Sequence, residues 1–156
     1  MIIIDDFIQD EELISKIQKD KDFWQEGYRW TGILSKDKII TNGDAINKGY
    51  ALNHHFDKDE AHWHETGEIK GPKLGTVYYP PMNEPQCEGG HLKIYDTYEM
   101  DLTAPYELIA PVPNRLVIFD ANKLHAVTEI TKGKRYAIAI NLWDEKPDMT
   151  EMVESL

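Results

Sequence analysis

The chain has 156 residues, of which 41% are hydrophobic and 29% charged, and this balance predicts a single globular domain spanning residues 1–156. Its formal net charge of −11 argues against nucleic acid or an anionic membrane as a partner. No apolar run approaches the ~20 residues of a transmembrane helix, and the first residues, MIIIDDFI, are too short and too acidic for a signal peptide. Because Cys87 is the only cysteine, no internal disulfide can form, and we expect a soluble protein of the reducing cytoplasm.

The N-terminal part predicts one strand and one helix. Residues 2–4 are three isoleucines, a β-branched run that favours a strand. After Asp10, apolar residues recur at near-helical spacing, with acidic residues in the first turn and lysines later, as the helix dipole favours. We therefore expect a helix over residues 11–22 that covers one face of a sheet.

From residue 27 onward the pattern is that of a β-protein. Short runs rich in Tyr, Trp, Ile and Val alternate with Gly, Asn, Asp and Pro. The expected strands are residues 29–34, 50–54, 74–79, 91–95, 106–110, 115–119, 126–130 and 136–142. Many short strands with little helix predict a mainly β fold, a sandwich or a jelly roll. The tail, residues 147–156, is expected to form a short closing helix or to fray.

One group of candidate metal ligands is His55-Phe56-Asp57. In an extended backbone, residues two apart point the same way, so this imidazole and carboxylate can reach one ion. His125, at the start of a distant predicted strand, would complete a two-histidine, one-carboxylate set, which is typical of non-haem Fe(II) sites that react with O2. The H-x-D alone is weak evidence, because roughly one such match is expected by chance in so acidic a chain.

A second group, His62-Trp63-His64 with Glu68 and Gly75, has the spacing of the first half of a cupin metal motif. The second half of that motif needs a glycine turn before the distal histidine, and residues 120–123 do not supply one. A cupin-type metal protein that uses His62, His64 and Glu68 therefore remains an alternative. Either group could also be a set of solvated polar side chains on a loop.

Arg135 stands at the start of the last predicted strand, one hairpin after His125. A guanidinium pairs with a carboxylate at two points, so the two residues together suggest a metal enzyme with an acidic co-substrate. The alternative interpretation is that Arg135 forms a surface salt bridge without a functional role. Alternation along residues 74–79 places Thr76 and Tyr78 on one face of the strand and Val77 and Tyr79 on the other.

A non-enzymatic jelly-roll binding module is the alternative from another class. Its pocket could be lined by four aromatic residues, Tyr78, Tyr79, Tyr95 and Trp143. Such a module needs neither an iron triad nor a buried carboxylate clamp, so Asp57 and Arg135 discriminate between the two classes.

Four motifs follow one another as HFDKDE, GTVYYP, EGGHLKIYD and NRLVIFDANKLHAVTEITKGKRYAIAINLW. Over about residues 50–144 they resemble the 2-oxoglutarate and Fe(II)-dependent dioxygenases, and they are most similar to the prolyl-hydroxylase-like branch. The resemblance implies a double-stranded β-helix (jelly roll) behind an N-terminal covering helix. It also implies that His55, Asp57 and His125 bind Fe(II) and that Arg135 and Tyr78 hold the distal carboxylate of 2-oxoglutarate. It favours the H-x-D over the H-x-H group.

The implied reaction is hydroxylation of a C–H bond by O2, coupled to decarboxylation of 2-oxoglutarate to succinate and CO2, with ascorbate as a further expected cofactor. Asp57 favours hydroxylation, because related halogenating enzymes leave that position open for halide. The implied substrate is a protein, with proline as one target, or an amino-acid-like small molecule. The sequence leaves the oligomeric state open.

Two features depart from the family. Gly89-Gly90-His91 stands where the family commonly has GGE, and we expect His91 to be a harmless replacement. The segment HWHETGE, residues 62–68, is an insert rich in metal-binding groups, which is either a lid that contacts the substrate or a solvated loop.

Overall fold

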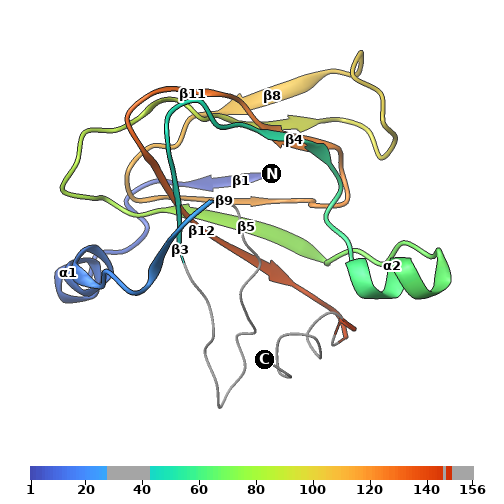
Figure 1. Cartoon of the computed structure of the whole chain (residues 1–156), viewed down its shortest axis with the longest axis horizontal. Helices are drawn as coiled ribbons and strands as arrows, with labels where there is room; N and C mark the ends of the chain where they lie inside the picture. Colours follow the sequence, from blue (N-terminus) through green and yellow to red (C-terminus); the bar gives the residue numbers. More distant parts are fainter. Residues whose placement is uncertain (28–42, 146, 149–156) are drawn as a thin grey trace.

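The structure is a computed structural model that describes residues 1–27, 43–145 and 147–148 (Figure 1). Two helices are described, α1 (Glu11–Lys19) and α2 (Glu60–Thr66). The strands are β1 (Ile2–Ile4), β2 (Trp24–Glu26), β3 (Gly43–Ile46), β4 (Leu52–His55), β5 (Leu74–Tyr79), β6 (Glu88–Gly89), β7 (Leu92–Tyr95), β8 (Tyr106–Ile109), β9 (Arg115–Phe119), β10 (His125–Val127), β11 (Ile130–Lys132) and β12 (Arg135–Leu142). In the described part of the chain, no helix is long and apolar enough to cross a membrane.

Two sheets face each other, as Figure 1 shows with β4 and β8 above β9, β5 and β12. The larger sheet has the order β1-β9-β5-β12-β3-β2 and the smaller one the order β4-β10-β7-β8. The chain passes back and forth between these sheets. The larger sheet contains β3, β5, β9 and β12, and the smaller sheet contains β4, β7, β8 and β10. This antiparallel crossing pattern is that of a jelly roll. The prediction of a mainly β, double-stranded β-helix fold is confirmed.

The hydrophobic core lies between the two sheets. Side chains from both contribute, among them Val77 of β5 and Val117 of β9 from the larger sheet, and Leu92 of β7 and Ile109 of β8 from the smaller one. In β9, Val117 and Phe119 are buried and Ile118 between them is less buried, because successive side chains of a strand point to opposite faces. In β5, Val77, Tyr78 and Tyr79 are all buried, but only Val77 and Tyr79 belong to the core between the sheets. The inner face of β5 therefore carries Val77 and Tyr79.

Helix α1 begins at the predicted place and ends earlier than expected. The Asp10 carboxylate accepts hydrogen bonds from the N–H groups of Glu12 (3.0 Å) and Leu13 (3.2 Å), which caps the first turn. The helix stops at Lys19 instead of residue 22, because Asp20 adopts an extended conformation and its carboxylate accepts from the N–H groups of two following residues. The Gln18 side-chain amide donates to the carbonyl of Pro81 (2.7 Å), which ties the helix to the loop after β5.

Other expected elements match to different degrees. The strands expected at residues 2–4, 74–79 and 115–119 have the predicted bounds. The strand expected at 126–130 divides into β10, which belongs to the four-stranded sheet, and β11, which pairs with β6 in a separate two-stranded sheet. The strand expected at 29–34, and the closing helix apart from Pro147 and Asp148, lie outside the described residues.

The sequence did not predict the short strands β2, β3 and β6 or the helix α2. Strand β3, with the sequence GDAI, lacks a strong strand pattern and forms between β12 and β2. The insert at residues 62–68 was interpreted as a lid or a solvated loop, but residues 60–66 form the helix α2. Its Asp59 cap accepts from the N–H of His62, and Gly67, in a left-handed conformation with φ 73°, donates its N–H to the carbonyl of Trp63. Both caps are common helix-end signals.

The first prediction concerns the packing of the core beside β10. Leu124 is fully buried directly before β10. Leu124→Ala should lower the unfolding free energy of the protein by about 2–5 kcal/mol, because a cavity remains in the core. The half-exposed Leu108 of β8 is the matched control, and Leu108→Ala should change the unfolding free energy by about 0.5 kcal/mol or less. Urea denaturation of both variants measures the difference, and equal losses would contradict the assigned core.

Candidate metal centre

Three side chains from three segments converge at one end of the barrel. His55 ends β4, Asp57 follows it before α2, and His125 opens β10. His125 and His55 are direct partners in the antiparallel β10–β4 pair. The Asp57 Oδ1 atom lies 3.3 Å from His55 Nε2 and 3.2 Å from His125 Nε2. Within the described residues, this is the one group of three or more His, Cys, Asp or Glu side chains arranged to hold a metal ion, with its ligand atoms within 4.8 Å of one another.

Backbone carbonyls orient both imidazoles. His55 Nδ1 lies 2.7 Å from the carbonyl oxygen of Asn53, and His125 Nδ1 lies 2.8 Å from that of Lys123. Each Nδ1 therefore carries a hydrogen and donates it, so an imidazole that gives up its Nε2 proton directs the Nε2 lone pair at the point shared with Asp57. Two neutral imidazole nitrogens and one carboxylate oxygen form the donor set that non-haem Fe(II) takes. The residues present fit that ion.

The electrostatics of Asp57 favour an anion. Burial alone would raise the pKa of Asp57, but hydrogen bonds with His125 and His55 outweigh burial and hold the pKa well below its ordinary value. For His55, burial alone would lower the pKa, but the hydrogen bond to Asp57 and the carbonyl of Asn53 raise it. Without a metal, the Asp57 carboxylate and a protonated His55 thus compensate one another, and a metal cation can replace the proton.

The second Asp57 oxygen has a partner of its own. Asn141, near the end of β12, donates its side-chain amide N–H to Asp57 Oδ2 at 2.9 Å. The Asp57 backbone N–H donates to the carbonyl of Ala121 at 3.1 Å. Sequence reasoning missed Asn141, although its position on the same face of β12 as Arg135 follows from strand alternation.

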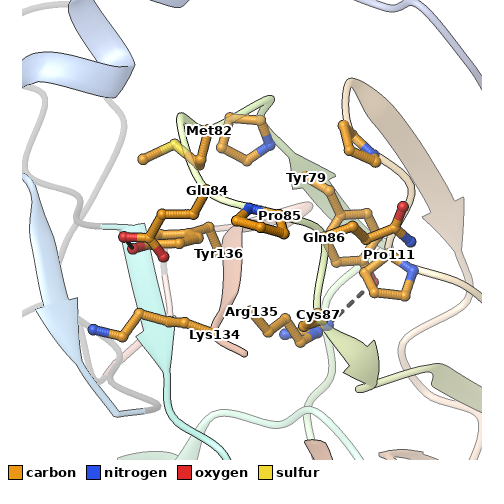
Figure 2. Close-up of a pocket in the computed structure, with 12 residues that line it drawn as sticks. Tyr79, Met82, Glu84, Pro85, Gln86, Cys87, Pro111, Lys134, Arg135 and Tyr136 are labelled. Atoms are coloured by element: carbon orange, nitrogen blue, oxygen red, sulfur yellow. Dashed lines mark hydrogen bonds between the residues drawn. The ribbon is translucent and has the colours of Figure 1, made fainter. Parts of the chain in front are cut away.

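Arg135 is a buried cation without an acidic partner. It is 3% exposed, its Nε donates to the carbonyl of Gly90 (3.0 Å), and its Nη2 donates to the Tyr79 hydroxyl (3.1 Å). Among the described residues no carboxylate pairs with Arg135, and its Nη1 makes no hydrogen bond. An unpaired buried guanidinium is costly unless a ligand supplies the anion. Figure 2 shows Arg135, Tyr79 and Cys87 together in the lining of a pocket at this end of β12.

Tyr78, expected to hold the co-substrate carboxylate with Arg135, contacts other residues in the structure. Its hydroxyl donates to Asn114 Oδ1 (2.7 Å), and its ring contacts Phe7 edge-on at a centroid distance of 5.9 Å. Burial raises the pKa of Tyr78 to about 12. Tyr78 faces away from the core and Tyr79 faces Arg135, because neighbouring residues of a strand point to opposite faces. The structure therefore brings Tyr79, and not Tyr78, to the arginine.

Small side chains separate Arg135 from the metal ligands. Arg135, Ala137, Ala139 and Asn141 share the inner face of β12, since Ala137 belongs to the core and Ala139 pairs with the core residue Val77. Ala139 is nevertheless exposed, so the interior is open at this point. A buried guanidinium and the triad with only small side chains between them on β12 fit a dicarboxylate such as 2-oxoglutarate.

The His62, His64 and Glu68 group does not form a metal site. On α2, residues two apart point in opposite directions, and the His64 side chain is largely exposed. The two ring nitrogens of His62 are engaged in opposite directions, Nδ1 with Asp148 (3.0 Å) and Nε2 with Glu68 (3.2 Å). The cupin-type alternative is thus not supported. The aromatic pocket of a binding module is not formed either, because Tyr95 is buried against His54, while Tyr78 and Tyr79 face opposite sides.

A sequence comparison identifies the family. The sequence profile of the 2OG-Fe(II) oxygenase superfamily matches residues 42–143, which include the triad and Arg135. The chain belongs to this superfamily. Membership in the 2OG-Fe(II) oxygenases implies Fe(II), 2-oxoglutarate and O2 as metal and co-substrates, as the resemblance predicted. No curated protein sequence matches the chain.

Several solved structures are similar to this 2OG-Fe(II) oxygenase chain. An oxidoreductase of the 2OG-Fe(II) oxygenase family from Burkholderia pseudomallei is 12% identical with a TM-score of 0.46, over 62% of this chain and 38% of that one. A prolyl-4-hydroxylase from Pseudomonas putida is 15% identical with a TM-score of 0.46, over 67% and 51%. A prolyl 4-hydroxylase structure from Phytophthora capsici is 19% identical with a TM-score of 0.43, over 64% and 30%. The chain thus spans between 30% and 51% of the length of these proteins.

The second prediction concerns the metal-free 2OG-Fe(II) oxygenase. The His55 imidazole should titrate above its ordinary pKa of 6.5, and Asp57→Asn should lower that pKa because the neutral amide no longer stabilises the imidazolium. NMR titration of the histidine resonances measures both values. Asp101→Asn removes an exposed carboxylate that hydrogen-bonds only with Thr103, and it is the control. A pKa of His55 that stays unchanged in Asp57→Asn would contradict the assigned electrostatics.

Proposed function

We propose that the chain is a 2-oxoglutarate- and Fe(II)-dependent dioxygenase that hydroxylates a C–H bond. The proposal rests on two features of the same jelly roll. One is the His55, Asp57 and His125 triad, and the other is the buried Arg135, which has no acidic partner among the described residues. In the overall reaction one oxygen atom of O2 enters the substrate as a hydroxyl group, and the other enters succinate as 2-oxoglutarate loses CO2.

The triad would hold Fe(II) through His55 Nε2, His125 Nε2 and one oxygen of Asp57. Bound Fe(II) would activate O2, and the net electrons would come from the decarboxylation of 2-oxoglutarate and from the substrate C–H bond. The protein keeps both imidazoles in the correct tautomer through the carbonyls of Asn53 and Lys123. Before the metal binds, hydrogen bonds with His125 and His55 lower the pKa of Asp57, so the carboxylate is ionised when the metal arrives. A three-residue set leaves positions on the metal for co-substrate and oxygen.

Arg135 and Tyr79 would bind the distal carboxylate of 2-oxoglutarate. The Arg135 guanidinium is already held by Gly90 and Tyr79, so its free N–H groups are oriented before the ligand arrives. Burial strengthens the charge pair and excludes water. The small residues Ala137 and Ala139 would leave the path from this clamp to the metal open.

The proposed substrate is a protein, including a prolyl residue of one, or an amino-acid-like molecule. The order of motifs, which is similar to that of the prolyl-hydroxylase-like branch, supports this class. A reducing compartment remains the proposed location, supported by the single, buried and unpaired thiol of Cys87. We propose residues 1–156 as one catalytic domain.

The third prediction tests the metal ligands. With Fe(II) and 2-oxoglutarate under air, the wild-type protein should form succinate slowly even without substrate. Asp57→Ala should reduce this rate more than about 100-fold, because removing a ligand costs at least as much as removing its supporting contacts. His62→Ala should stay within about twofold of wild type, since His62 contacts Asp148 and Glu68 and not the triad. Loss of activity in His62→Ala with retention in Asp57→Ala would contradict the proposed site.

The fourth prediction tests the co-substrate clamp. Arg135→Lys should raise the KM for 2-oxoglutarate about tenfold or more, because an ammonium cannot reproduce the two-point pairing. Tyr79→Phe should raise the KM about 2- to 10-fold through loss of one hydrogen bond. Tyr78→Phe is the matched control and should leave the KM unchanged, since the Tyr78 hydroxyl contacts Asn114 instead. Initial rates of succinate formation give these values, and a KM that responds to Tyr78 but not Tyr79 would contradict the assignment.

A further inference from the structure

We propose that Asn141 is a positioning residue that restricts Asp57 to one metal-facing oxygen and thereby sets the metal affinity. The inference rests on the proposed function, because it concerns the same triad. The two Asp57 oxygens have separate partners in the structure. Oδ1 faces the Nε2 atoms of His55 and His125, at 3.3 and 3.2 Å, whereas Oδ2 accepts the amide N–H of Asn141 at 2.9 Å.

The residues around Asn141 position Asp57 for this contact. Asn141 of β12 pairs with Gly75 of β5, and Gly75 has no side chain. A Cβ at residue 75 would lie only 2.8 Å from the Ala121 Cβ, so glycine is required for Ala121 to pack this closely. The Ala121 carbonyl in turn accepts the Asp57 N–H at 3.1 Å. The chain of contacts from Gly75 through Ala121 thus places Asp57 within reach of the Asn141 amide.

The chemistry of the contact explains its effect. A carboxylate can offer a metal one oxygen or both. An amide N–H that engages Oδ2 favours the first arrangement, which keeps more positions on the metal open for other ligands. The amide is neutral, so it orients Asp57 without removing the negative charge that attracts the cation. Supporting hydrogen bonds of this kind typically change metal affinity about 10- to 100-fold.

The same strand also carries the carboxylate clamp. Arg135 opens β12 and Asn141 lies six positions later, about 20 Å along an extended strand. A rigid strand therefore relates the clamp residue to the residue that orients the metal ligand. Asn141 acts through Asp57, and it has no described contact with either histidine.

The experiment is a titration of the full metal-free chain with Co(II), an ion whose visible absorption reports ligand arrangement. The variants are Asn141→Ala, which removes the side chain, and Asn141→Leu, which keeps similar volume but cannot donate. Leu142→Ala is the matched control, because Leu142 is the next residue of β12, points to the opposite face and is 50% exposed. The thermal midpoint of each metal-free protein, measured by circular dichroism, reports whether the fold is retained.

We expect both Asn141 variants to bind Co(II) about 10- to 100-fold more weakly than wild type, with an altered visible spectrum and a metal-free midpoint close to that of wild type. Leu142→Ala should match wild type in affinity and spectrum. The inference is overturned if both Asn141 variants bind Co(II) within about threefold of wild type. It is also overturned if weaker binding is accompanied in both by an equally large loss of the metal-free midpoint, which would assign Asn141 to stability.

A second comparison separates this inference from the proposed function. Asp57→Ala, titrated in the same way, should lose Co(II) binding. If Asp57→Ala loses binding and the Asn141 variants do not, only the role of Asn141 is wrong. If Asp57→Ala binds Co(II) as wild type does, the triad itself is wrong, and both proposals are overturned.

Discussion

The site depends on the antiparallel pairing of β10 with β4, which places His125 directly opposite His55. These residues are far apart in sequence, and only the strand register brings their imidazoles to the same carboxylate. A shift by one residue would turn one imidazole to the other face of the sheet. Strand β10 pairs in regular register with β7 on its other side, whereas its pairing with β4 is irregular after His125. The regular ladder holds β10 in place, and the irregular one lets the chain leave β4 toward Asp57.

Strand β12 organises the other half of the site. It lies between β5 and β3 in the larger sheet, and its first three residues pair with β3 while its last five pair with β5. One inner face carries Arg135 at the first position, two alanines in the middle and Asn141 near the end. A paired central strand is a rigid support, and rigid supports hold functional groups more accurately than loops do. The distance between the clamp and the metal ligands is therefore a property of the sheet.

The site combines a half-buried carboxylate, Asp57, with a buried guanidinium, Arg135. Asp57 is compensated by His55, His125 and Asn141, whereas Arg135 has only a carbonyl and a hydroxyl as partners. Such an arrangement opposes folding, because an unpaired buried charge lowers stability. Local violations of this kind are expected where a protein binds a ligand. An anionic co-substrate at Arg135 and a divalent cation at Asp57 would compensate both.

The sequence by itself determined the mainly β class, the bounds of β5 and β9 and the three residues that the structure brings together at the metal centre. It did so because strand alternation and motif order are local properties of the chain. Only the tertiary structure selected Tyr79 over Tyr78, since alternation divides the two tyrosines between faces but does not say which face is inside. The role inferred for Asn141 and the strand β3 likewise depend on partners distant in sequence. Helix α2 could have been recognised from its Asp59 and Gly67 caps, but the segment was interpreted as a lid or a loop, with its histidines as an alternative set of metal ligands. On a helix these two histidines point apart.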